Sequence, residues 1–194
     1  MHEAVILPAM VKQADIQKDD FAGNTLDVAK ALLGKKLIYR DCTGIIVETE
    51  AYRTDAASHY ITRPRQGVML AETYGCVYIY LIYGMYFCLN FTTEKDGIGA
   101  VLIRAVEPLT GIDQMKKRRG TKDKISLTNG PGKLTQAFAI DQTHHGEEVG
   151  KSIKLLMNSS VTNPVVARGP RIGISKSRNL PWRFWIANNP YVSK

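Results

Sequence analysis

Hydrophobic and polar positions alternate most regularly between residues 77 and 90, in the stretch VYIYLIYGMYFCLN. The β-branched and aromatic residues on both sides of a glycine predict two short strands and a turn, because glycine accepts positive φ without steric cost. Two registers are open. A two-residue turn at Tyr83-Gly84 mixes tyrosines and aliphatic residues on each face. A three-residue loop, Ile82-Tyr83-Gly84, pairs Leu81 with Met85 instead.

The three-residue loop separates the two faces of this hairpin. One face then carries the apolar residues Val77, Ile79, Leu81, Met85, Phe87 and Leu89. The other face carries Tyr78, Tyr80, Tyr86, Cys88 and Asn90. A buried face needs such segregation, so we prefer this register and expect Tyr83 to project from the tip. Taken alone, the pattern favours an ordinary hairpin that packs on other strands while its tyrosine hydroxyls reach water.

Residues 43–52 place two carboxylates directly after an apolar run. If the strand through Ile45–Val47 continues, Glu48 and Glu50 lie on one face, about 6–7 Å apart along it. Carboxylates beside buried residues are unfavourable unless cationic or polar groups meet them, and such surroundings can raise one pKa and produce a general base. For the pattern alone, a strand end that reaches solvent is the simpler explanation.

An arginine interrupts the apolar strand predicted at residues 100–106. Arg104 should be paired or lie at a ligand, because arginine is rarely buried without a partner. Its partner is either one of the carboxylates Glu48 and Glu50, or a substrate anion or water. The sequence leaves both possibilities open.

The remaining patterns predict further helices and strands along one domain. A helix begins at Asn24-Thr25 and ends at Gly34, and a long loop covers residues 53–75. Further helices are expected at 112–119 and from Pro131, and strands at 36–39, 153–157, 168–174 and 182–186. Residues 1–20 are expected to form an N-terminal arm, and residues 21–194 a single domain.

Composition and charge narrow the class of protein. The chain has 194 residues, 44% hydrophobic, with no apolar run of membrane-spanning length and no signal-peptide pattern, so we expect a cytoplasmic location. The cysteines Cys42, Cys76 and Cys88 show no spacing typical of zinc sites. The net charge of +8 indicates a polyanion or an acidic surface as partner. The basic cluster Lys116–Lys124 is either a solvated face or a patch that contacts phosphates.

Several motifs together resemble the alkyladenine (3-methyladenine) DNA glycosylase family, the monofunctional type without a helix-hairpin-helix. The most specific are Glu48-Thr49-Glu50-Ala51-Tyr52 and Tyr83-Gly84-Met85-Tyr86-Phe87-Cys88-Leu89-Asn90. The other matching segments are His59, Tyr78-Ile79-Tyr80, Leu102–Pro108, Gly130–Leu134 and Arg168–Gly173. The resemblance covers roughly residues 20 to 193. It implies an α+β fold: a single mixed domain with a curved, mainly antiparallel β-sheet, a protruding hairpin and a few flanking helices.

The resemblance implies roles for single residues. Glu50 matches the general base that activates water, and Arg104 matches the arginine beside that water. Tyr52 and His59 match one wall around the flipped base, and Tyr80 matches the opposite wall. The other matches are Tyr83 as the side chain wedged into the duplex, Asn90 as the residue that crowds the 2-amino group of guanine, Leu102 at the pocket edge and Met85 near the DNA.

The resemblance also implies an activity. We expect a DNA-repair hydrolase that flips alkylated or deaminated purines out of duplex DNA and leaves an abasic site. It would act as a monomer on double-stranded DNA, without a metal, a cofactor or a membrane, and be nucleoid-associated if bacterial. The rival hypothesis is a binding module that stacks single-stranded nucleic acid on Tyr78, Tyr80 and Tyr86. Glu50 separates the two, because a carboxylate near phosphates repels a ligand but serves hydrolysis.

Overall fold

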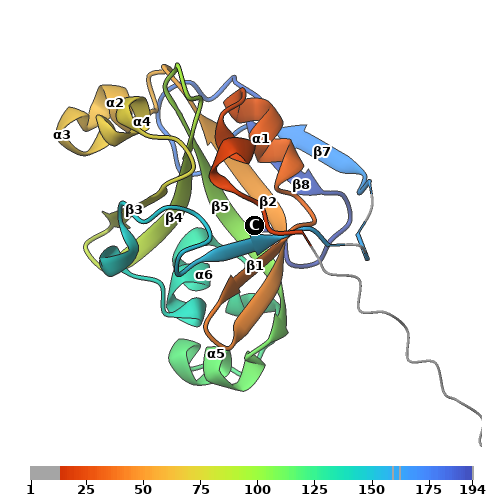
Figure 1. Cartoon of the computed structure of the whole chain (residues 1–194). Coiled ribbons are helices and arrows are strands. Elements are labelled where there is room, and N and C mark those ends of the chain that lie inside the picture. The colour runs from red at the N-terminus through yellow and green to blue at the C-terminus, as the bar shows by residue number, and fades with distance from the viewer. Residues whose placement is uncertain (1–13, 159, 162, 194) are drawn as a thin grey trace, which may run out of the picture.

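The computed structural model describes residues 14–158, 160–161 and 163–193. Its centre is an eight-stranded sheet in the order β3-β4-β5-β2-β1-β6, with β8 paired to both β2 and β7. The strands are β1 (Lys36–Tyr39), β2 (Cys42–Tyr52), β3 (Val77–Ile82), β4 (Tyr86–Thr93), β5 (Gly99–Thr110), β6 (Lys154–Leu156), β7 (Val166–Gly169) and β8 (Arg183–Ile186). All neighbouring strands pair antiparallel. Figure 1 shows the β3–β4 hairpin on one side of the molecule and β7–β8 on the other.

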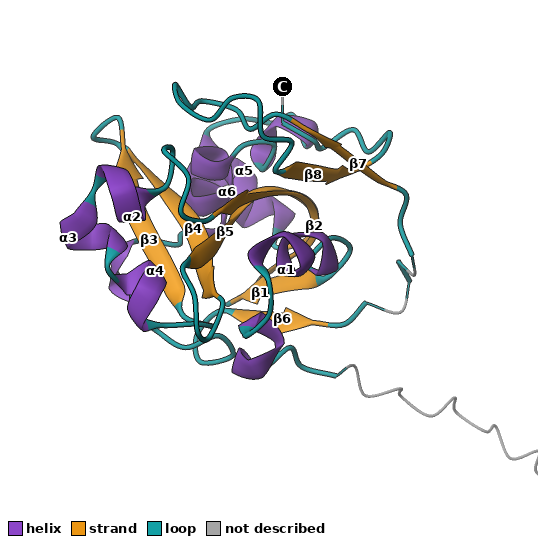
Figure 2. Ribbon diagram, turned by 90° about the horizontal axis from the view of Figure 1, so that it is seen from above, coloured by secondary structure: helices purple, strands orange, loops and turns teal. Residues whose placement is uncertain are grey.

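Short helices flank the sheet. They are α1 (Thr25–Ala31), α2 (His59–Thr62), α3 (Pro64–Gly67), α4 (Met69–Glu72), α5 (Ile112–Arg119) and α6 (Pro131–Phe138), with 3-10 turns at Lys18–Phe21, Ile125–Leu127 and Gln142–His144. Helix α1 packs on β2 and β5, whereas α6 packs on β4, β5 and α5. Figure 2 shows α2, α3 and α4 beside the hairpin. This arrangement confirms the predicted α+β fold with a mainly antiparallel sheet.

Local sequence explains where several elements begin. The side chain of Asn24 accepts a hydrogen bond of 2.9 Å from the Leu26 N–H, as expected of a residue that caps a helix. Pro131 occupies the first turn of α6, where the missing N–H removes no helical hydrogen bond. The main core then forms between the sheet and both helices, and includes the buried residues Phe21, Phe91 and Phe138.

The hairpin confirms the predicted faces but corrects the loop. Tyr80 pairs with Cys88, and Tyr78 pairs with Asn90, so the tyrosines and the asparagine share one face. The connection does have three residues, but they are Tyr83-Gly84-Met85, and Ile82 pairs with Tyr86 rather than Leu81 with Met85. The cause is the turn itself: Tyr83 and Gly84 both have positive φ, and the Met85 N–H donates to the Ile82 carbonyl at 3.1 Å. Met85 therefore leaves the apolar face and lies in the loop.

Two other expectations are corrected. The predicted loop at 53–75 contains α2, α3 and α4, because Ser58 caps the first of these turns and Pro64 begins the second. The strand expected at 168–174 is β7, which ends at Gly169. Pro170 follows directly and has no N–H to continue the ladder. The next residues consequently leave the sheet and approach β2.

The first twenty residues divide at the edge of the described region. Residues 1–13 of the expected arm lie outside it. Asp15 forms a β-bridge with Leu156, and the Ile16 N–H donates to the Leu155 carbonyl at 2.8 Å. The described part of this segment is thus joined to β6. None of the helices in the described ranges has the length and apolar character needed to cross a membrane.

Candidate active site

A cleft of about 770 Å³ opens between the hairpin, α2, the start of α6 and the segment that follows β7. Six of the predicted site residues line it: Tyr52, His59, Tyr80, Tyr83, Leu102 and Arg104. Asn90 lines a smaller recess of about 20 Å³, which shares Tyr52, His59 and Tyr80 with the cleft. Met85 lies outside both linings, beside Tyr83 at the exposed hairpin tip. The structure thus brings together residues from four strands and one helix.

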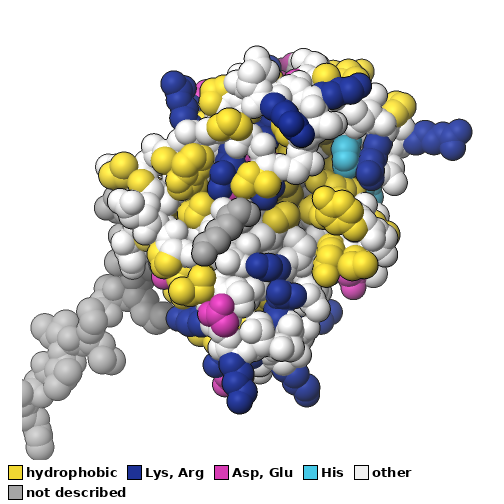
Figure 3. Space-filling model, turned by 180° about the vertical axis from the view of Figure 1, so that it is seen from behind, with side chains coloured by type: hydrophobic (Ala, Val, Ile, Leu, Met, Phe, Trp, Pro, Cys, Tyr) yellow, Lys and Arg dark blue, Asp and Glu magenta, His cyan; other side chains and the backbone are white. Residues whose placement is uncertain are grey.

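The lining of the cleft carries positive charge. Besides Arg104 it includes Arg63, Arg119, Lys133 and Lys176, and no aspartate or glutamate. Lys133 donates to a neutral group, the Asn129 Oδ1, at 2.8 Å, so this contact does not cancel its charge. Figure 3 shows a face of the molecule where Lys and Arg side chains surround hydrophobic ones, with few acidic side chains among them. Such a surface suits a polyanion.

Glu50 lies immediately behind this lining and is fully buried. Its Oε2 accepts a hydrogen bond of 2.8 Å from the Tyr52 hydroxyl and lies 3.2 Å from Nη1 of Arg104. Its Oε1 accepts a bond of 2.7 Å from the Ile172 N–H. Burial raises the pKa of Glu50 above its ordinary value, although Arg104, the Ile172 amide and Tyr52 each oppose that rise. The site therefore holds a carboxylate that is removed from water and fixed in orientation by its three partners.

Arg104 settles the choice that the sequence left open. Its Nε lies 3.3 Å from Oε1 of Glu48, while its Nη1 faces Glu50. Burial opposes its charge, but the two carboxylates outweigh burial and raise the pKa of Arg104. The guanidinium also lines the cleft, so the same group binds both acids and remains within reach of a ligand. The register between β2 and β5 shifts at Glu48, and such a bulge re-aims side chains next to a site.

Sequence reasoning missed the groups that hold Glu48. Arg183 Nε donates to its Oε1 at 2.5 Å, and Ser193 donates through both its N–H and its hydroxyl, at 2.7 and 2.9 Å. Glu48 is consequently fully buried but well supplied with donors. The pairing of Arg183 opposite Glu50 in β8 could not be read from a four-residue strand, and Ser193 carries no sequence signal at all.

Arg171 was matched only as part of a motif, and the structure shows its contacts. Its guanidinium lies 4.6 Å from the Tyr52 ring centre and 5.2 Å from that of Trp182. It also donates to both oxygens of Asp55, at 2.6 and 3.1 Å, and to the Ala51 carbonyl at 2.9 Å. Tyr52 is thereby fixed from behind, and the Asp55 loop is tied to the strand that carries Glu50.

The aromatic residues around the recess contact one another. The His59 ring meets Tyr80 edge-on at 4.3 Å between centres, and the His59 Nδ1 is hydrogen-bonded to the Tyr78 hydroxyl at 2.8 Å. Burial lowers the pKa of His59 to about 4 and raises that of Tyr78 to about 12. Both groups are therefore neutral near pH 7. Because the His59 and Tyr80 rings touch, a planar ligand between them would have to separate them.

Asn90 presents one particular atom to the recess. Its Nδ2 donates to the carbonyls of Tyr78 and Cys88, at 3.0 and 3.3 Å. Only an amide nitrogen can make these two bonds, so the orientation of the side chain follows from its partners. The amide oxygen is the polar atom that remains available to a ligand.

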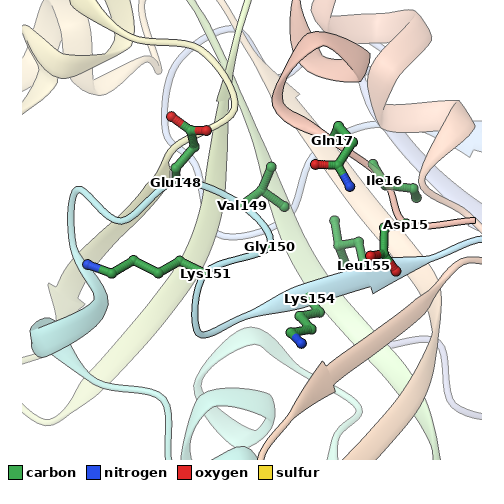
Figure 4. Close-up of a pocket in the computed structure, with 9 residues that line it drawn as sticks. All are labelled: Asp15, Ile16, Gln17, Glu148, Val149, Gly150, Lys151, Lys154 and Leu155. Carbon is green, nitrogen blue, oxygen red and sulfur yellow. The ribbon is translucent and has the colours of Figure 1, made fainter.

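A second hollow, of about 450 Å³, lies where the described chain begins, next to β6 (Figure 4). Its charged lining residues are Asp15, Glu148, Lys151 and Lys154, and Glu148 pairs with Lys18 at 3.0 Å. These side chains are on the surface and form no buried cluster. Across residues 14–193, wherever the chain is described, no group of three or more His, Cys, Asp or Glu side chains is placed to hold a metal ion.

Comparison with known proteins agrees with this geometry. The family model for methylpurine-DNA glycosylases matches residues 19–190. The chain belongs to this family. Members are DNA glycosylases, hydrolases that cleave N-glycosyl bonds in DNA repair, and the family resemblance found in the sequence is confirmed.

Relatives of the family have similar length and high identity to the chain. A protein of Nitrosospira multiformis is 44% identical over 180 residues, which cover 90% of this chain and 92% of the relative. A protein of Prosthecochloris aestuarii is 45% identical over 188 residues, covering 91% and 90%. One from Chlorobium phaeobacteroides is 43% identical over 189 residues, covering 92% and 96%. All three are named as candidate 3-methyladenine DNA glycosylases.

Proposed function

We propose that this protein removes alkylated or deaminated purines from duplex DNA by flipping the damaged nucleotide into the cleft and hydrolysing its N-glycosidic bond. The product is an abasic site. The observation that carries the proposal is the buried Glu50 carboxylate, held by Tyr52, Arg104 and the Ile172 amide directly behind an aromatic, cationic cleft. A module that only binds nucleic acid has no use for a desolvated carboxylate at that place.

Base flipping is needed because the glycosidic bond of a stacked nucleotide is out of reach. Unstacking costs a few kcal/mol, and each aromatic face on which a base stacks returns about 1–3 kcal/mol. Tyr52, His59 and Tyr80 are the aromatic residues that line both the cleft and the recess. An alkylated purine is electron-poor or cationic and stacks on tyrosine more favourably than a normal base. A damaged base is thus bound in the cleft more favourably than a normal base, provided that it separates the rings of His59 and Tyr80.

Glu50 acts as the general base in this proposal. It takes a proton from water as the water oxygen bonds to C1′ of the sugar, and the C1′–N bond breaks with its electron pair leaving on the purine. Arg104 lines the cleft beside Glu50 and orients that water. The carboxylate also stabilises the positive charge that develops on the sugar. No lysine attacks C1′, so we expect neither a Schiff base nor strand cleavage.

Tyr83 acts as the wedge that occupies the space left by the flipped base. Its side chain is 81% exposed at the hairpin tip, and the neighbouring Met85 is 66% exposed, a costly display of apolar surface unless a partner covers it. Leu102 forms part of the pocket wall, and Asn90 crowds the 2-amino group of guanine. The partner is double-stranded DNA, bound by a monomer in the cytoplasm, and the net charge of +8 favours that partner.

Incubation with a duplex that contains one hypoxanthine, followed by alkali, tests the proposal. The parent protein should create one alkali-sensitive site at the lesion. Glu50→Gln should bind the duplex but lose excision, because an amide cannot accept the proton. Excision by this variant at the parent rate would contradict the role of Glu50. Tight binding of undamaged single strands without base release would favour the binding module instead.

A further inference from the structure

Ser193 connects the last described residues to the carboxylate cluster. Its N–H and hydroxyl both donate to Glu48, and its own hydroxyl oxygen accepts from Nη2 of Arg104 at 3.4 Å. Arg183 completes the arrangement, since it donates to Glu48 and to the Ser193 carbonyl, the latter at 3.1 Å. Tyr191 is buried against Val47 and anchors the segment.

The distances show which donors bind the Glu48 carboxylate. Oε1 of Glu48 accepts hydrogen bonds from the Arg183 Nε and the Ser193 hydroxyl, whereas Arg104 Nε lies 3.3 Å away in an ion pair and makes no hydrogen bond. A carboxylate has about four acceptor positions, and an unobstructed arginine prefers to bind one carboxylate with two parallel N–H groups. Ser193 and Arg183 occupy the positions that such a pairing needs. Arg104 is consequently shared between the two carboxylates, and its Nη1 pairs with Glu50.

We propose that Ser193 and Arg183 are positioning residues for the reaction, which keep Arg104 on Glu50 by saturating the competing carboxylate Glu48. The inference rests on the proposed role of Glu50. If the Ser193 hydroxyl is lost, Arg104 gains an open position on Glu48 and loses its acceptor for Nη2. It then moves toward Glu48 and away from Glu50, and the ionised form of Glu50 loses its nearest cation.

Ser193 contacts two charged groups near Glu50, namely Arg104 and Glu48, and the charge of Glu48 itself raises the pKa of Glu50. The other titratable groups around Glu50 come from β2, the hairpin and the segment after β7. Tyr52 is on the same strand, Tyr80 and Cys88 face Glu50 from the hairpin, and Arg171 lies behind the Tyr52 ring. A rise in the pKa of Glu50 in a Ser193 variant is the result expected when Arg104 moves away from Glu50. The acid limb of the pH profile of excision should then move to higher pH, because Glu50 must be ionised to act as a base.

The experiment compares Ser193→Ala with Ser126→Ala, a matched change at a hydroxyl that donates to the Asp123 carbonyl on the surface. Glu50 is titrated by carbon NMR in protein with labelled glutamate carboxyls, assigned with Glu50→Gln. Glu50 should titrate at higher pH in Ser193→Ala than in the parent protein. In Ser126→Ala it should titrate at the same pH as in the parent. Single-turnover excision of hypoxanthine near neutral pH should fall about two- to tenfold in Ser193→Ala, the effect of one hydrogen bond.

A second variant keeps the test decisive if Ser193→Ala unfolds. Arg183→Lys removes the Nε donor from Glu48 but keeps the charge, and should move the Glu50 titration in the same direction. An unchanged Glu50 titration in a folded variant overturns the inference and leaves the proposed function intact. A raised Glu50 titration in a protein that releases no base supports the positioning and contradicts the proposed function.

Discussion

The hydroxyl of Tyr52 donates a hydrogen bond of 2.8 Å to Oε2 of Glu50, two positions earlier on the same strand. The residue expected to stack on the base is thus also a donor to the residue expected to activate water. The two roles can be separated, because stacking needs the ring and the hydrogen bond needs the hydroxyl.

Tyr52→Phe should raise the pKa of Glu50, since the lost bond favoured the ionised carboxylate. Glu50 would then lose its proton only at higher pH. The acid limb of the excision rate should move to higher pH, while binding of a duplex with a stable abasic analogue stays near the parent value. Single-turnover rates across pH 5 to 9 measure this shift. An unmoved acid limb would show that the hydroxyl does not tune Glu50.

Tyr83→Gly should separate folding from DNA distortion. Tyr83 has a φ of 52°, a left-handed conformation that costs a non-glycine residue about 1–2 kcal/mol and glycine almost nothing. The variant should therefore unfold at the same urea concentration as the parent or higher. It should nevertheless excise hypoxanthine from duplex DNA more slowly, because no wedge holds the base out.

Tyr83→Phe serves as the matched control, since it keeps the ring and removes only the exposed hydroxyl. Fluorescence of a 2-aminopurine beside the lesion reports flipping directly. Equal fluorescence with the parent and the glycine variant would contradict the wedge.

Arg171→Met should destabilise the protein by about 3–5 kcal/mol, because it leaves the Asp55 carboxylate buried beside an apolar side chain. Urea unfolding measures the loss. Adding Asp55→Asn should recover part of it, since the uncompensated charge is then gone. If the double variant is no more stable than Arg171→Met, the loss comes from packing on Tyr52 and Trp182.

The same pair makes a prediction for pH. Burial alone would raise the pKa of Asp55, but the bonds from Arg171 and from nearby backbone amides outweigh it and lower that pKa. A carboxyl whose pKa is lower in the folded state stabilises the fold above its unfolded pKa of about 3.9, and this contribution disappears as pH falls through the folded value. The acid loss of stability should be smaller in Asp55→Asn than in the parent.

Much of the hairpin was predictable because strand side chains alternate with a period of two. Any loop that keeps the parity of the register gives the same faces, so Tyr80 and Asn90 were placed together although the loop was shifted by one residue. The shift itself follows from the positive φ of Tyr83, which local sequence does not favour.

The candidate site was predictable where function leaves unusual residue types in a regular pattern. Glu48, Glu50 and Arg104 stood out because charges interrupt apolar strands, and the structure joins all three. Their remaining partners were not predictable, since Ile172 acts through a backbone N–H and Ser193 lies 145 positions from Glu48. The edge contact of His59 with Tyr80 likewise depends on how α2 folds within a stretch that lacks periodicity.

The wide sequence separation within the cluster bears on the order in which the molecule assembles. Ala51 and Glu50 meet Arg171 and Ile172 across 120 and 122 positions, and Glu48 meets Arg183 across 135. Closing long loops is entropically expensive, and contacts of this kind slow the approach to the native state. The hairpin and the β1–β2 pair need only neighbouring residues. The site around Glu48 and Glu50 is therefore expected to form only after these wide loops close, whereas the hairpin can form from neighbouring residues alone.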